Sequence, residues 1–236
     1  MSTGPNISAH DGVSRRLEFV AISKKQATEL VLANHYLHRE CPISWSWGIA
    51  VDGEILGVLT IGKPMWSVAC GLVGETKQDL ERPNARWRDV YELNRLWVDD
   101  CVTDHCIESR FIGSCLRELK KVNPNLILVS YADTARGHLG VVYQATGFIY
   151  TGLSSEFEDI TLEGYGDHRS VPKERQGEKI GNRRAWADDP NAIRVERSRK
   201  HRYVWFADPT DATLLVWEPQ PNPKKPASCE LSEGAK

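Results

Sequence analysis

The chain has 236 residues, of which 41% are apolar and 26% are charged, and its net charge is −2. This composition is normal for a soluble globular protein, and the net charge excludes a globally basic surface for nucleic acid. No run of about 18 apolar residues occurs and the N-terminal stretch has no apolar signal core, so we expect a cytoplasmic protein without a membrane span. The six cysteines form no C-x-x-C pair and are expected to be reduced thiols.

The first predicted helix covers residues 23–38 and has two histidines near its end. Ser23 is a suitable N-cap, and the apolar residues that follow it recur at i, i+3 and i+4. His35 and His38 are then expected on one face of the last turn, and Pro42 ends the helix.

A β-hairpin and a long insertion follow this helix. Residues 44–62 predict two strands joined at Asp52-Gly53, a dipeptide that is typical of two-residue turns. Residues 62–88 mix glycine, proline and charge, and we interpret them as an irregular insertion. Loops of that length in a compact domain are usually functional or mobile.

The second half of the chain alternates strands and helices. The strand predicted at 89–100 has two alternating faces, one with Val90, Glu92, Asn94, Leu96 and Val98 and the other with Tyr91, Leu93, Arg95 and Trp97. The elements after it are a helix at 107–122, a buried strand at 125–133, a helix at 138–148 and a short strand at 149–153. This order predicts an α/β domain with one mixed sheet flanked by helices.

Charge is unevenly distributed along the chain. Between Arg169 and Arg202 there are eleven Lys/Arg against five Asp/Glu. We therefore predict a basic segment at 165–206 within a domain that covers 18–218. Polar flanks are expected to be flexible at 1–17 and disordered at 219–236.

The order of elements resembles the GNAT superfamily of N-acetyltransferases. In that family, a strand precedes a loop and helix that hold the pyrophosphate of acyl-CoA, with a motif Arg/Gln-x-x-Gly-x-Gly/Ala. The stretch "RFIGSC" matches at Arg110 and Gly113 and departs from the motif at Cys115. The resemblance implies that Arg110, Gly113 and Ser114 hold donor phosphates, as a helix N-terminus is suited to do.

Five sequence blocks together resemble the Mom family of bacteriophage DNA-modification proteins: "HYLHRECPIS", "YELNRLWVDD", "IGSCLREL", "VSYADTARGHLGVVYQATGFIYTGL" and "RSRKHRYVWF". The resemblance implies conversion of adenine N6 in DNA to a methylcarbamoyl (acetamido) adduct that protects phage DNA from host restriction. It also implies an iron requirement and an acyl-CoA-linked mechanism. Simple acetyl transfer does not give this adduct, so a glycine-derived donor stays open beside acyl-CoA.

Three residues in the predicted strands and the last predicted helix are candidates for catalysis. Asp133 follows a buried strand, where ligands bind in open α/β sheets, although an aspartate there can also be an N-cap. Tyr143 is a suitable acid, because a phenol and a thiol have similar pKa values, or else a packed aromatic. Arg95 lies in a strand and should face a ligand or form a salt bridge, with Asp133 or Glu92 for example.

The stretch "NHYLHRECP" supplies two further candidates. Two histidines alone do not make a metal site, and most such pairs are solvated helix ends. The family resemblance nevertheless implies roles for His35 and Tyr36, and His35 and Asp133 are the candidate metal ligands.

Contacts to double-stranded DNA are expected from the basic segment and one tryptophan. Lys and Arg neutralise phosphates, and aromatic side chains can stack on a displaced base. The candidates are Arg183, Arg184, Arg199, Lys200, Arg202 and Trp66.

Three functions are compatible with these features. The first is a DNA adenine-N6 transferase that acts on a flipped base. The second is an ordinary GNAT N-acetyltransferase for a small amine or a protein. The third, a non-catalytic DNA-binding module, explains poorly why polar groups cluster at strand ends.

Overall fold

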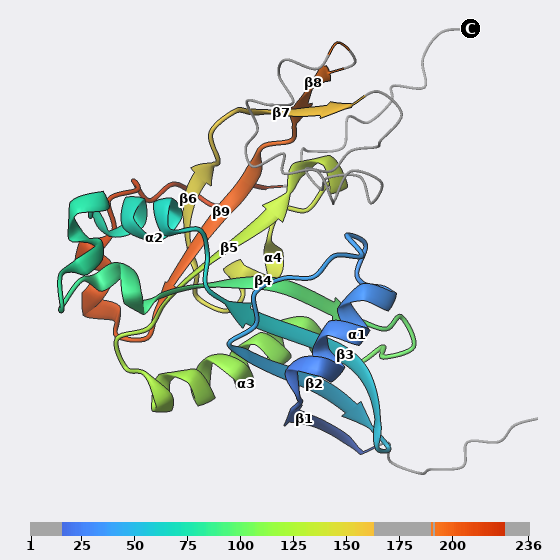
Figure 1. Cartoon of the computed structure of the whole chain (residues 1–236). Helices are drawn as coiled ribbons and strands as arrows, with labels where there is room; N and C mark the ends of the chain where they lie inside the picture. Colours follow the sequence, from blue (N-terminus) through green and yellow to red (C-terminus); the bar gives the residue numbers. More distant parts are fainter. Residues whose placement is uncertain (1–15, 163–189, 191, 225–236) are drawn as a thin grey trace, which may run out of the picture.

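The computed structural model describes residues 16–162, 190 and 192–224, and it is built around one seven-stranded sheet (Figure 1). The strand order is β1-β2-β3-β4-β5-β9-β6. All neighbouring strands are antiparallel except β4 and β5. The strands are β1 (Leu17–Ala21), β2 (Trp45–Val51), β3 (Glu54–Gly62), β4 (Val90–Val98), β5 (Ile127–Asp133), β6 (Ile149–Leu153) and β9 (Lys200–Phe206).

Helices cover both faces of the sheet. On one face, α3 (Ile107–Val122) and α4 (Val141–Gln144) pack on the core that contains Leu59, Leu93 and Leu128. On the other face, α1 (Lys24–Asn34) packs on β3, and α2 (Trp66–Val73) packs on β5 and β9. The predicted mixed α/β architecture is confirmed. None of the described helices is long and apolar enough to cross a membrane.

Helix α1 ends earlier than predicted. Ser23 is the N-cap, as expected, and accepts a hydrogen bond from Gln26 N. The helix stops at Asn34, and His38 adopts a positive φ of 43° with its Nδ1 2.9 Å from the carbonyl oxygen of Leu32. The imidazole thus contacts a backbone group near the helix end. The prediction that His35 and His38 share one helical face is therefore wrong.

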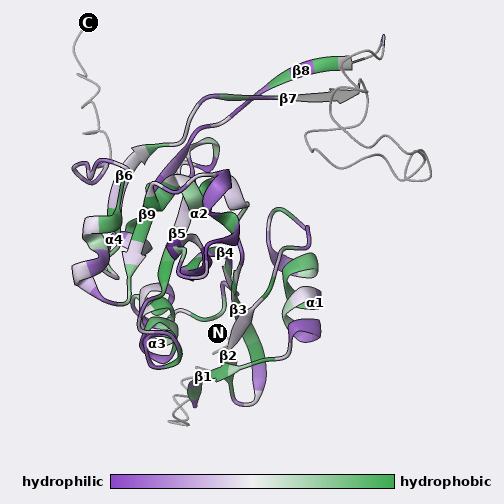
Figure 2. Cartoon of the chain, turned by 60° about the vertical axis from the view of Figure 1, so that its left-hand side comes forward, coloured by the Kyte–Doolittle hydropathy of each residue, from purple (hydrophilic) through white to green (hydrophobic). Residues whose placement is uncertain are grey.

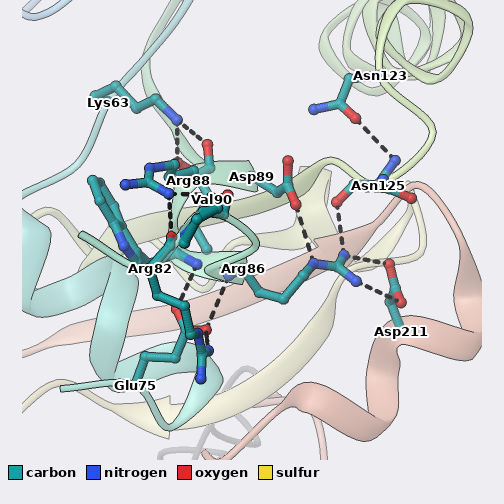
Figure 3. A network of polar contacts seen from close by, with 12 residues as sticks. Lys63, Glu75, Arg82, Arg86, Arg88, Asp89, Val90, Asn123, Asn125 and Asp211 are labelled. Carbon is teal, nitrogen blue, oxygen red and sulfur yellow. Dashed lines mark hydrogen bonds and ion pairs between the residues drawn. The ribbon is translucent and has the colours of Figure 1, made fainter. Parts of the chain in front are cut away.

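The insertion at 62–88 is ordered into helices rather than irregular, which corrects that prediction. It contains α2 and two 3-10 helices, Lys77–Glu81 and Arg86–Asp89. Arg86 binds Asp211 with both terminal nitrogens, at 2.7 and 3.2 Å, and also contacts Asp89 (Figure 3). Because the bidentate pair joins segments 125 residues apart, it fixes the insertion against the end of the domain.

A β-bulge at Asn94 changes the faces of β4. Thr60 pairs with Arg95 but Ile61 pairs with Leu93, so Asn94 is an extra residue in β4. Leu96 therefore packs in the same core as Leu93, and Trp97 packs toward α1 on the opposite face. Counting back from Trp97 places Arg95 on the face of Glu92, contrary to the predicted alternation.

Two strands form an arm outside the main sheet. β7 (Phe157–Leu162) pairs with β8 (Ala192–Arg197), and both views show this pair extending away from the seven strands (Figure 1, Figure 2). Most of the predicted basic segment between these strands lies outside the described residues. At the other end, Gln220 N donates to Tyr150 O at 2.8 Å, so described structure continues past the predicted boundary at 218.

Candidate functional site

A cavity of about 560 Å³ lies where β4 and β5 separate. The two strands are paired only from Val90 to Leu93 and from Ile127 to Ser130, and each then continues without its neighbour. The cavity is lined by the two strands, the end of α1 and the segment that leads into α4. Its polar lining includes His35, Tyr36, Glu92, Asn94, Arg95, Glu108, Tyr131, His138, Tyr143 and Lys200.

Glu92 is a cavity residue that the sequence did not single out as functional. The residue as a whole is half-buried, and in the part of the chain that the structure describes its carboxylate has no ion pair within 4.0 Å. Burial raises its pKa, while Arg95 and Lys200 act in the opposite direction. A carboxylate with a raised pKa in a cavity is suited to accept a proton. The one available signal was its acidic side chain within a strand whose other residues are mostly apolar.

Arg95 has an uncompensated charge on the same cavity wall. Its Nη1 donates to Asn94 O at 2.5 Å, and its buried Nε has no hydrogen-bond partner. Among the described residues no carboxylate lies within 4.0 Å of it, so the alternative of a salt bridge to Asp133 or Glu92 is wrong. A buried N–H without an acceptor is costly, which favours a ligand oxygen as the partner of this half-buried guanidinium.

Tyr143 is buried at the end of the cavity nearest α4. Its ring packs at 5.4 Å from those of Phe148 and Tyr203. Burial is the main cause that raises the pKa of its hydroxyl to about 12, and a hydrogen bond with Ser130 opposes this. The phenol is therefore protonated at neutral pH and can donate a proton or a hydrogen bond into the cavity.

His35 and Tyr36 lie just beyond α1, where they form part of the cavity wall. His35 is 5% exposed and its ring stacks on Tyr36 with centroids 4.4 Å apart. Its Nδ1 accepts a hydrogen bond from Leu37 N at 3.2 Å. Burial, followed by the charge of Arg95, lowers the pKa of His35 to about 4. The imidazole is therefore neutral at pH 7, with its proton on Nε2.

This geometry does not fit the predicted iron site. A metal-bound histidine usually donates a hydrogen bond through its other ring nitrogen, but Nδ1 of His35 is an acceptor and Nε2 bears the proton. Nowhere in 16–162 or 192–224 do three His, Cys, Asp or Glu side chains come together as a potential ligand set. We therefore assign no chemistry to iron.

Asp133 lies at the end of β5, as predicted, and its carboxylate already has three neighbours. Oδ1 accepts hydrogen bonds from Ala135 N at 3.0 Å and from the Ser198 hydroxyl at 2.7 Å. Oδ2 is 4.0 Å from Nζ of Lys200. These contacts match the N-cap alternative for Asp133, and its catalytic role stays a prediction.

The "RFIGSC" stretch lies within α3, which covers 107–122 as predicted. Arg110 is the fourth residue of the helix, and Gly113 and Ser114 lie one turn further on. The Arg110 side chain is half-exposed and 3.9 Å from Asp104. The roles of Arg110, Gly113 and Ser114 in holding donor phosphates stay predictions.

The residues predicted to contact DNA differ in the contacts that their side chains already make within the protein. Lys200 lines the cavity with its side chain 41% exposed. Arg199 donates to Ser154 O. Arg202 donates to Thr151 and packs 3.7 Å above the ring of Trp217.

Trp66 is 48% exposed at the start of α2, outside the cavity lining. Arg183 and Arg184 lie outside the described residues. The DNA contacts of all six residues remain predictions.

Comparison with known proteins identifies the family. The chain is 29% identical to "Methylcarbamoylase mom" of Escherichia phage Mu, over 89% of this chain and 85% of that protein. Similar solved structures include an N-acetyltransferase from Staphylococcus aureus Mu50 (TM-score 0.45, 12% identity, 82% of this chain and 99% of that one). Another is a GNAT-family acetyltransferase from Streptococcus pneumoniae (TM-score 0.43, 12% identity, 81% of this chain and 99% of that one). The model of the Mom protein family matches residues 16–224, and the chain therefore belongs to the Mom protein family.

Proposed function

We propose that this chain is a DNA-modifying transferase that adds a methylcarbamoyl group to N6 of adenine. The observation that supports this most strongly is the cavity wall, where a carboxylate with a raised pKa, an uncompensated guanidinium and a protonated phenol come together. These are the groups that transfer to a weak nitrogen nucleophile requires. The name of the phage Mu relative supports the identity of the transferred group.

The substrate is an adenine flipped out of double-stranded DNA. N6 lies inside the duplex, so an enzyme must extrude the base to act on it. A cavity of about 560 Å³ falls within the range of small-molecule sites and accommodates one base and a small donor. Lys200 at the wall and the exposed Trp66 are the described residues best placed to contact the surrounding DNA.

Three side chains share the reaction. The adenine N6 forms a bond to the methylene carbon of the donor group, and the donor's leaving group departs with the bonding electron pair. Glu92 accepts the proton that N6 loses, and the Tyr143 hydroxyl donates a proton to the leaving group. Arg95 binds the carbonyl oxygen of the transferred group and stabilises the negative charge that develops near it.

The geometry favours Glu92 over Asp133 as the proton acceptor. Both oxygens of Asp133 already have protein neighbours, whereas Glu92 has none within ion-pair distance in the described chain. Asp133 instead fixes the turn after β5 and the position of Lys200. The adduct would shield phage DNA from host restriction enzymes, as the family resemblance implies.

The proposal is tested by mass spectrometry of nucleosides from plasmid DNA after expression of the wild type and of Glu92→Gln. We expect a modified adenosine with the wild type and a large reduction with the variant. Glu54→Gln, the same chemical change at an exposed hairpin position, should modify DNA normally. Unmodified DNA from folded wild type, together with acetylation of a small amine by acetyl-CoA, would favour an ordinary N-acetyltransferase instead.

A further inference from the structure

The loop between β4 and α3 is acidic where the superfamily binds a pyrophosphate. The resemblance stated above assigns donor phosphates to the loop and helix that follow this strand. We propose that the donor of this enzyme is a small molecule without phosphate groups, and not a coenzyme A thioester. The proposal rests on the proposed transferase function and concerns only the chemical class of its donor.

The charges of this loop oppose an anionic ligand. Residues 99–110 contain four carboxylates and one Lys/Arg, Arg110. The carboxylates are Asp99, Asp100, Asp104 and Glu108. Arg110 is itself 3.9 Å from Asp104, and Glu108 lines the cavity. The diphosphate of coenzyme A would therefore meet several like charges within about a Debye length.

The start of α3 already has an anionic side chain in its first turn. The first N–H, of Ile107, already donates to Asp104 O at 3.2 Å. Glu108 in the first turn interacts favourably with the positive end of the helix dipole, which is the interaction that a phosphate would use.

Gly113 does not provide a close approach for phosphates. It lies within the continuous helix, and a Cβ added there would meet only the Arg117 side chain, at 3.7 Å. Its backbone N–H belongs to the helical hydrogen-bond pattern and is not directed at a ligand. Gly113 thus matches the glycine of the GNAT motif, but it lies in a helix and not in a loop whose backbone could approach a phosphate.

The cavity wall has two Lys/Arg side chains. Lys200 lies 4.0 Å from Asp133, and Arg95 lies on the opposite side of β4 from the α3 core. Arg95 has a buried Nε without a hydrogen-bond partner and can bind one carbonyl or carboxylate oxygen. This favours a compact donor such as an amide or amino-acid derivative, which presents one such oxygen and no phosphate.

Isothermal titration calorimetry at low salt tests the proposal with coenzyme A and acetyl-CoA as ligands for the full chain. We expect no saturable binding by the wild type. The variant Asp100→Asn/Asp104→Asn/Glu108→Gln removes three like charges and releases Arg110, so it should bind both ligands at least about tenfold more tightly.

The matched control is Glu29→Gln/Glu54→Gln/Glu118→Gln, which changes the net charge equally at exposed positions away from the loop. The control should behave as the wild type. Micromolar binding by the wild type would overturn the proposal, and so would equal affinities of the loop variant and the control. Because calorimetry needs no DNA, these outcomes are independent of whether adenine is modified.

Discussion

Glu92→Gln should lower activity and raise stability at the same time. The substitution keeps the shape of the side chain and removes its negative charge. Since burial raises the pKa of Glu92, the folded state retains a proton that the unfolded state releases. Folding stability due to this group is therefore complete below the unfolded pKa of about 4.5 and falls as the pH rises through the window up to the folded pKa.

The size of each effect follows from the surroundings of the carboxylate. Each unit by which its pKa is raised costs about 1.4 kcal/mol of stability at neutral pH. Arg95 and Lys200 offset part of the effect of burial, and the net direction is a raised pKa, so Glu92→Gln should raise Tm at neutral pH. Loss of a proton acceptor should reduce the rate by about 10²–10⁴-fold.

Two measurements on the same purified proteins check this. Thermal melts at several pH values report stability, and nucleoside mass spectrometry reports modification. The stability gain of the variant should shrink toward acidic pH, where Glu92 in the wild type is protonated. Wild-type levels of modified adenosine in Glu92→Gln would refute the catalytic role. If Glu92→Gln has a lower Tm than the wild type at neutral pH, the argument that the buried Glu92 charge destabilises the folded state is refuted.

Three further outcomes are expected. His35→Gln should make folding stability less dependent on pH between about pH 6.5 and pH 4. Because the pKa of His35 is lowered in the folded state, the wild type loses about 3 kcal/mol of stability as the pH falls through this window. Thermal melts at stepped pH values measure this difference. Tyr143→Phe should retain a wild-type melt but lose at least about tenfold in modification, because only the proton donor is removed. Arg86→Ala and Asp211→Asn should each destabilise by about 1–3 kcal/mol and show strong coupling in a double-mutant cycle; additive effects would contradict the observed bidentate pair.

Local sequence patterns were sufficient for most of the fold. The apolar run before Asp133 predicted β5, and the apolar side of residues 107–122 predicted α3, because each of these elements buries one continuous set of side chains. The Asp52-Gly53 turn was equally visible, since its positive φ values of 51° and 91° suit those residue types. Such features depend on neighbours a few residues apart.

Features determined by distant contacts were not predictable. The end of α1 depends on a turn in which His38 contacts the carbonyl of Leu32. The order of the insertion depends on Arg86 reaching Asp211, which is 125 residues away in the chain. Neither partner is marked by spacing, so mixed composition suggested an irregular segment where the structure has helices.

The site itself depends on one residue of register. A strict two-residue alternation assigned Glu92 and Arg95 to opposite faces of β4, and Arg95 was expected to face a ligand or to form a salt bridge. The bulge at Asn94, whose side chain bonds Thr60 and Pro42 O, inverts the alternation after that point. It brings a cation and an anion to one face without pairing them, and that separation leaves room for a ligand that offers an oxygen to Arg95 and a proton to Glu92. The reactive arrangement therefore arises from a break in the pattern that predicted the strand.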